Sequence, residues 1–105
     1  MTERARNYLI GLLSELRDLP KETEWVEFKV NYTNPQDIGE YISALSNSAV
    51  LNGKANAYLL WGIDNENHQI VGTAFKPERT KKGNEELENW LLRLLNPRIH
   101  FRFYQ

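Results

Sequence analysis

Three carboxylates and one lysine stand at spacings that suit chemistry on a phosphodiester. Glu22, Glu27 and Lys29 lie within eight residues of one another, and Asp64 follows about 35 residues later, after an apolar run. Carboxylate oxygens are ligands that suit Mg²⁺ or Mn²⁺, and a lysine beside them offsets negative charge that develops on a phosphate. The pattern therefore predicts a metal site made by Glu22, Glu27 and Asp64, with Lys29 as a neighbouring catalytic cation.

A predicted strand over residues 25–30 positions the first part of this site. Its apolar side chains alternate with polar ones, so Glu27 and Lys29 share one face, about 6.7 Å apart along the strand. Charged pairs on a solvated strand face are common, so this pair has a purely structural interpretation as well. On an unbroken strand Glu22 lies on the opposite face, and it joins Glu27 only if the chain turns between them.

Asp64 follows a second predicted strand, residues 57–63, which is apolar on both faces and therefore belongs in the centre of a sheet. An aspartate that directly follows a strand most often initiates a turn. The alternative is a third metal ligand at a strand's carboxyl end, where the sites of α/β proteins form. Both interpretations of Asp64 stay open at this stage.

The remaining pattern predicts an α/β (α+β) sandwich with about three helices and a mixed, mostly antiparallel sheet. Asn34 caps the second helix, followed by Pro35 at its first position, and Asn84 caps the third. We expect residues 1–20, an amphipathic helix, to form one compact unit with the domain over 21–105. The last predicted strand runs to the end of the chain, which favours a fragment of a longer protein. The expected helices are 3–18, 35–46 and 85–95, and the expected strands are 25–30, 57–63, 68–73 and 98–104.

The formal net charge of −1 argues against a protein that binds nucleic acid by bulk electrostatics. The charge is unevenly distributed, however: residues 1–75 carry 6 basic and 10 acidic side chains, whereas residues 76–105 carry 7 basic and 4 acidic ones. A solvated loop and a charge-protected sheet edge would explain the basic end without a ligand. The phosphate-binding alternative assigns contacts to Lys29, Lys81, Lys82, Arg98 and Arg102.

Composition excludes several other classes of site. The 105 residues contain no cysteine, so disulfides, thiolate metal sites and a cysteine nucleophile are ruled out within them. A nucleotide site of the phosphate-loop type is unsupported around Gly53 and Lys54, because Ser48 replaces the first glycine and Ala55 the closing serine or threonine, so no role for ATP is predicted. No signal peptide or membrane-spanning run is visible, and we expect an intracellular, cytoplasmic protein with no membrane partner.

Four segments together resemble a known family. They are residues 22–29 (Glu-Thr-Glu-Trp-Val-Glu-Phe-Lys), the helix 38–47, the strand 59–64 and residues 70–72. Their order and spacing over about residues 20–104 resemble the Schlafen AlbA-like domain, described as a DNA-binding domain of bacterial and archaeal regulators and of Schlafen proteins. The resemblance implies nucleic-acid binding. For Schlafen nucleases it implies metal-dependent RNA cleavage at three carboxylates, and Glu22, Glu27 and Asp64 occupy those positions here.

Three hypotheses follow. The first is a nucleic-acid-binding module, for DNA or RNA, within a larger regulatory or defence protein. The second is a metal-dependent ribonuclease with Mg²⁺ or Mn²⁺ at the three carboxylates, so whether the chain is an enzyme stays open. The third is a protein-interaction or dimerisation domain, with a homodimer formed through an exposed edge strand over residues 99–104.

Overall fold

The computed structural model describes residues 1–19, 23–83, 85–95 and 99–105, and these form one α+β globule with three helices. The predicted fold class and number of helices are confirmed. The elements in chain order are α1 (Glu3–Arg17), β1 (Val26–Lys29), α2 (Pro35–Leu51), β2 (Tyr58–Trp61), the 3-10 helix η1 (Pro77–Arg79), β3 (Lys81–Lys82), β4 (Glu85–Glu86) and α3 (Leu87–Leu94).

The predicted mostly antiparallel sheet is wrong. Within the described residues there are two small sheets, a parallel pair of β1 and β2 and an antiparallel pair of β3 and β4. The chain that returns after β2 forms a single antiparallel bridge, between Ile63 and Ile70, instead of a full strand over 68–73. The connection through α2 is long enough to join β1 and β2 in parallel, whereas a short turn joins only antiparallel strands.

The predicted last strand, 98–104, does not form over the part of it that the structure describes. Residues 99–105 run as an extended segment outside any sheet. Their aromatic side chains pack instead: the Phe103 ring lies 6.1 Å from Trp61 and 6.4 Å from Phe75, and Phe101 lies 5.8 Å from Phe103. The alternation of apolar residues therefore reflects packing on the core and not a ladder of backbone hydrogen bonds.

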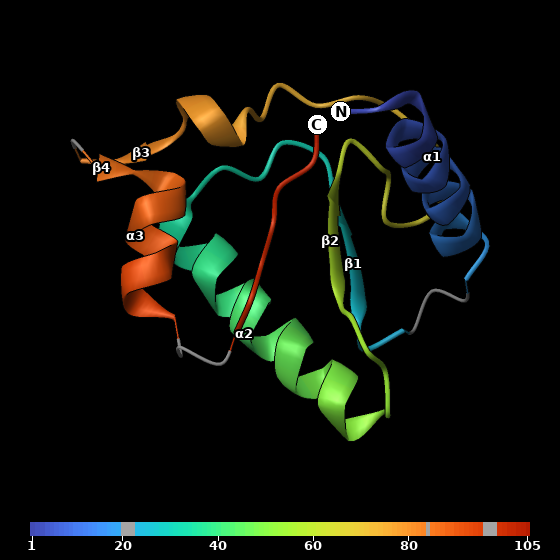
Figure 1. Ribbon diagram of the computed structural model, residues 1–105, viewed down its shortest axis with the longest axis horizontal. Coiled ribbons are helices and arrows are strands. Elements are labelled where there is room, and N and C mark those ends of the chain that lie inside the picture. The colour runs from blue at the N-terminus through green and yellow to red at the C-terminus, as the bar shows by residue number, and fades with distance from the viewer. Residues whose placement is uncertain (20–22, 84, 96–98) are drawn as a thin grey trace.

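Helix α1 covers one face of the parallel strand pair, and α2 and α3 lie on the other side (Figure 1). The helix begins where predicted, because the Thr2 hydroxyl accepts a hydrogen bond from the Ala5 amide at 3.0 Å. Leu16 on α1 packs against Val26 and Phe28 of β1, and all three are buried. The predicted apolar stripe of this helix is confirmed as the cover of one sheet face.

The second core lies between α2, α3 and the opposite sheet face, around the fully buried side chains of Ile38, Leu87 and Leu91. Asn34 caps α2 as expected, with its side-chain oxygen accepting from the Asp37 amide at 3.2 Å. The helix is longer than predicted and ends at Leu51, since residues 48–51 contain no helix breaker and Ala49 is buried.

Helix α3 begins at Leu87, two residues later than predicted, and the predicted cap Asn84 lies outside the described residues. Glu85 and Glu86 form β4, in which they face Lys82 and Lys81 of β3. Opposite charges across an antiparallel pair stabilise it. Glu85 also forms an ion pair with Arg93 at 2.6 Å, so this residue fastens the short hairpin to α3.

Arg17 and His68 join the end of α1 to the turn that follows β2. The Arg17 Nε donates to the His68 carbonyl at 2.7 Å, and the His68 Nδ1 lies 2.9 Å from the Arg17 carbonyl. A carbonyl only accepts, so Nδ1 carries the hydrogen. The buried imidazole packs against Phe28 in a tilted arrangement with 4.3 Å between ring centroids, while its Nε2 has no hydrogen-bond partner among the described residues.

Replacing His68 by alanine is expected to lower the free energy of unfolding by about 2 kcal/mol, because the hydrogen bond to the Arg17 carbonyl and the contact with the Phe28 ring are lost. His68 also has a φ of +56°, which alanine adopts less readily than asparagine. His68→Asn should lose about half as much, since asparagine tolerates positive φ and its amide donates to the Arg17 carbonyl. Urea denaturation followed by tryptophan fluorescence measures both variants. Equal losses for the two would contradict this role of the His68 hydrogen bond.

Candidate nucleic-acid interface

Lys29 and Glu27 lie together on the α2-facing side of β1, as the strand periodicity predicts. The Lys29 Nζ is 3.5 Å from the Glu27 Oε1, and the two side chains are 23% and 31% exposed. Their neighbours on the strand, Val26 and Phe28, are buried on the α1 side. A lysine and a carboxylate thus form an ion pair that solvent still reaches.

Two tyrosines complete the surroundings of Lys29, although no sequence pattern marks them as site residues. Its Nζ lies 5.1 Å from the Tyr32 ring centroid and 4.9 Å from that of Tyr41, within the range of cation–π attraction. The rings meet edge to face, with centroids 5.5 Å apart. Tyr32 follows Lys29 closely in sequence, but Tyr41 comes from α2, so only the packing of that helix on the sheet brings it here.

These contacts keep Lys29 charged and Tyr32 neutral. Burial lowers the pKa of Lys29, but hydrogen bonding and electrostatic interaction with Tyr41, together with the charge of Glu27, outweigh it, and the pKa of Lys29 is raised. Burial, followed by the negative charge of Asp37, raises the pKa of the Tyr32 phenol. At neutral pH the site therefore presents a charged ammonium beside the uncharged Tyr32 phenol.

The loop that carries Tyr32 is fixed by the chain that returns after β2. The Trp61 indole donates to the Tyr32 carbonyl at 2.7 Å. Asn31 accepts from the Ala74 amide at 2.8 Å and from the Thr73 hydroxyl at 3.0 Å. Gly62 permits the close approach of this chain: its φ is +87°, and a Cβ there would lie 3.1 Å from the Gly72 backbone. These hydrogen bonds hold the loop that follows Lys29 in place.

Asp64 takes the turn-initiating role that the sequence offered as one alternative. Its Oδ1 accepts from the backbone amides of Glu66 at 2.8 Å and Asn67 at 3.1 Å. Glu22 lies outside the described residues, and within the described part of the chain no three histidine, aspartate or glutamate side chains gather as a metal-binding group. The three-carboxylate metal site accordingly stays a prediction.

The predicted phosphate-binding residues other than Lys29 occupy the C-terminal third of the chain. Lys81 and Lys82 are exposed on β3, Arg102 is exposed on the extended C-terminal segment, and Arg98 lies outside the described residues. The stretch 76–82 and the carboxyl ends of β1 and β2 lie along the same upper edge of the molecule in Figure 1. Exposed Lys76 and Arg79 add to the positive charge of that stretch.

A family comparison gives these residues a context. The family model described as "Schlafen, AlbA_2" matches residues 22–105. This chain belongs to the Schlafen AlbA_2 family. No curated protein and no solved structure gives a significant match to it.

Helix α1 of this AlbA_2 domain precedes the matched segment, and it still contributes to the fold by covering β1. Its apolar side chains fill the sheet face opposite Lys29, so α1 supports the Lys29 surface without contacting it. Within the described residues, none of the helices combines the length and apolar character required to cross a membrane.

Trp25 shares the sequence alternation of Glu27 and Lys29, but in the AlbA_2 domain its ring belongs to the cluster on the α1 side. It precedes β1 and packs with the α1-side cluster, its ring 6.3 Å from Tyr58. The Lys54 Nζ lies 5.0 Å above the Trp25 ring. Both residues sit at the amino ends of the parallel strands, at the opposite edge from the carboxyl end of β1 where Lys29 lies (Figure 1).

Proposed function

We propose that this domain binds nucleic acid along the edge that carries the carboxyl end of β1 and the basic stretch 76–82. Schlafen AlbA_2 domains are a family associated with nucleic-acid-binding regulators. The observation that carries the proposal for this chain is Lys29, a charged side chain that stays partly exposed while two tyrosines and Glu27 fix its position. An ammonium held in place loses little conformational entropy when it contacts a phosphate.

The ammonium of Lys29 can donate to one further partner. It has three N–H donors, of which Glu27 and Tyr41 engage two, so one is left for a phosphate oxygen. Lys81, Lys82 and Arg102 are exposed, and in this proposal each adds a phosphate contact to that of Lys29. Because the net charge of the chain is −1, binding must rely on this local concentration of basic residues and not on overall charge.

The affinity for nucleic acid should fall steeply as salt rises. If the five predicted basic residues each engage one phosphate, the logarithm of the association constant should change with the logarithm of salt concentration with a slope of about −4.5 for duplex DNA and about −3.5 for single strands. Fluorescence anisotropy with labelled RNA and DNA between 50 and 200 mM salt measures the slope. A slope weaker than about −1 would sink the proposal.

A metal-dependent ribonuclease is a second candidate, favoured by the direct contact between Glu27 and Lys29. The described carboxylates fit a metal site only in part, because Glu27 faces Lys29 and Asp64 already accepts two backbone amides. Running the binding mixtures with Mn²⁺ and with EDTA tests this candidate. Metal-dependent cleavage that is lost in Glu27→Gln would establish an enzyme, and intact substrate in every mixture would leave a binding module.

A further inference from the structure

Glu27 places a negative charge beside the ammonium that would contact a phosphate. Its Oε1 lies 3.5 Å from the Lys29 Nζ, and its side chain is 31% exposed. A carboxylate is an acceptor only, so it has no hydrogen to offer a phosphate oxygen. A phosphate that approaches Lys29 is therefore attracted by the ammonium and repelled by the neighbouring carboxylate.

Lys29 keeps most of its support when the Glu27 charge is removed. The distance of 3.5 Å is longer than that of a strong charge-assisted hydrogen bond, about 2.7–2.9 Å. The Tyr32 and Tyr41 rings lie 5.1 and 4.9 Å from the Nζ, and Tyr41 also forms a hydrogen bond with it. Because ion pairs that solvent reaches contribute little to stability, Glu27 adds only a small share to the positioning of Lys29.

The geometry of an ammonium determines how close the two negative groups come. Its N–H donors point in tetrahedral directions, so the Glu27 Oε1 at 3.5 Å and a phosphate oxygen at about 3 Å from the same nitrogen lie about 5 Å apart. Coulomb repulsion between two unit charges at about 5 Å lowers the affinity about fourfold in bulk water, and more at a partly buried site. This loss exceeds the gain from positioning.

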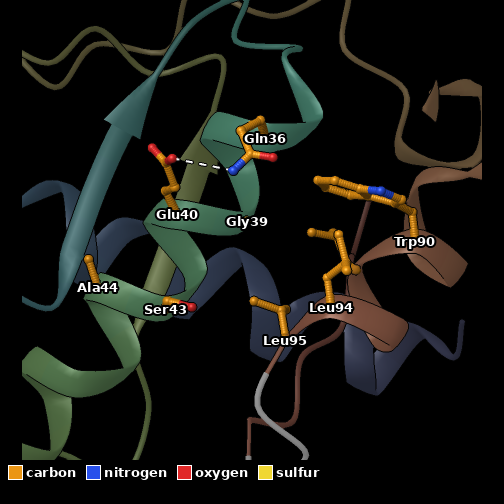
Figure 2. Close-up of a pocket in the computed structure, with 9 residues that line it drawn as sticks. Gln36, Gly39, Glu40, Ser43, Ala44, Trp90, Leu94 and Leu95 are labelled. Atoms are coloured by element: carbon orange, nitrogen blue, oxygen red, sulfur yellow. Dashed lines mark hydrogen bonds between the residues drawn. The ribbon is translucent and has the colours of Figure 1, made fainter. Parts of the chain in front are cut away.

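The groove between α2 and α3 offers a phosphate no alternative position. It has a volume of about 380 Å³. Figure 2 shows Gln36 and Glu40 on its α2 side, joined by a hydrogen bond of 3.4 Å, and Trp90 and Leu94 on its α3 side. Among the described residues that line it, none is a lysine or an arginine. A phosphate in this groove would meet a carboxylate and apolar side chains, so the contact stays with Lys29.

We propose, on the basis of the function proposed above, that Glu27 determines specificity by limiting the affinity of Lys29 for a single phosphate. The domain then retains a nucleic acid only when other basic residues bind further phosphates of the same strand, because linked contacts reinforce one another. Inorganic phosphate or a mononucleotide brings no such additional contacts and is not retained. Glu27 thus selects polymeric nucleic acid and keeps its binding reversible.

Glu27→Gln keeps the length of the side chain and removes its charge. The variant should bind labelled RNA and DNA about fivefold more tightly than the parent chain at 50 mM salt, and the gain should shrink at 200 mM because salt screens the repulsion. Fluorescence anisotropy in EDTA measures both affinities, and EDTA prevents a divalent ion from bridging the carboxylate and the phosphate. The side chain is partly exposed, so the circular dichroism spectrum should stay that of the parent chain.

Glu24→Gln is the matched control. Glu24 is exposed at the amino ends of the parallel strands, where its carboxylate accepts from the Asn52 amide at 3.0 Å. The glutamine oxygen still accepts this hydrogen bond, and the net charge changes by the same amount as in Glu27→Gln. The affinity should change less than about twofold, because Glu24 is remote from the phosphate at Lys29.

Combining Glu27→Gln with Lys29→Met locates the effect. Relative to Lys29→Met alone, the double variant should gain less than about twofold, since no phosphate lies beside position 27 once the ammonium is gone. A gain below about twofold in Glu27→Gln, an equal gain in Glu24→Gln, or a full gain without Lys29 would overturn the role of Glu27 and leave the proposed function intact. A parent chain without salt-dependent binding would overturn both.

Discussion

Replacing Lys29 by methionine is expected to weaken binding of nucleic acid about tenfold at 50 mM salt and to make the salt slope shallower by about 0.9 on duplex DNA. Methionine keeps an unbranched chain against the Tyr32 and Tyr41 rings but removes the charge. The loss should be similar for every sequence tested, because a phosphate contact carries no sequence information. Anisotropy titrations at several salt concentrations give both quantities.

Lys54→Met is the matched control for Lys29→Met. Lys54 also rests on an aromatic ring, that of Trp25 at 5.0 Å, but it lies at the amino ends of the parallel strands. Its replacement removes the same charge and should change the affinity less than about twofold. Equal losses for the two variants would mean that the carboxyl edge has no special role and that only net charge matters.

Replacing Ile38 by alanine is expected to lower the free energy of unfolding by about 3 to 4 kcal/mol. Ile38 is fully buried in the cluster that joins α2 to α3, next to Leu91 and Trp90. Truncation removes three carbon atoms from a packed core and leaves a cavity that the two helices cannot fill without moving. A domain of this size has a total stability of about 5 to 15 kcal/mol, so the variant should unfold at markedly lower urea concentration.

Ile38→Val sets the scale for that result and should lose only about 1 kcal/mol, because a single methylene is removed. Leu51→Ala is the surface control: the Leu51 side chain is 85% exposed, and its loss should stay within about 0.5 kcal/mol. If Ile38→Ala proved as mild as Leu51→Ala, the α2–α3 cluster would not be the main core.

The features that the sequence predicted correctly are those that neighbouring residues specify. Thr2 and Asn34 start α1 and α2 because each side chain caps an amide three residues ahead. Glu27 and Lys29 share a face because alternate residues on a strand always do. Asp64, for which a turn and a metal ligand both stayed open, takes the local alternative and initiates a turn through amides two and three residues away. Each of these features depends only on residues within a few positions of one another, so the local sequence is enough to predict it.

The features that the sequence left undecided or predicted wrongly depend on which distant segments meet. The apolar alternation in 99–104 fits either a strand or an extended segment that packs on Trp61. The structure shows the second, in which the Phe103 ring packs with Trp61 and Phe75. Helix α3 begins at Leu87, later than predicted, because Glu85 and Glu86 pair with the lysines of β3 instead of joining the helix.

Local sequence pattern is sufficient to predict the number of helices, the two central strands and the shared face of Glu27 and Lys29. The parallel direction of β1 and β2, and the contact of Tyr41 from α2 with Lys29, depend on tertiary packing. It also placed Val50 and Leu51 in solvent beyond the core. Periodicity and capping depend on residues that are close together in the sequence. Strand pairing and helix packing depend on the relative free energies of contacts between segments that are far apart in the sequence.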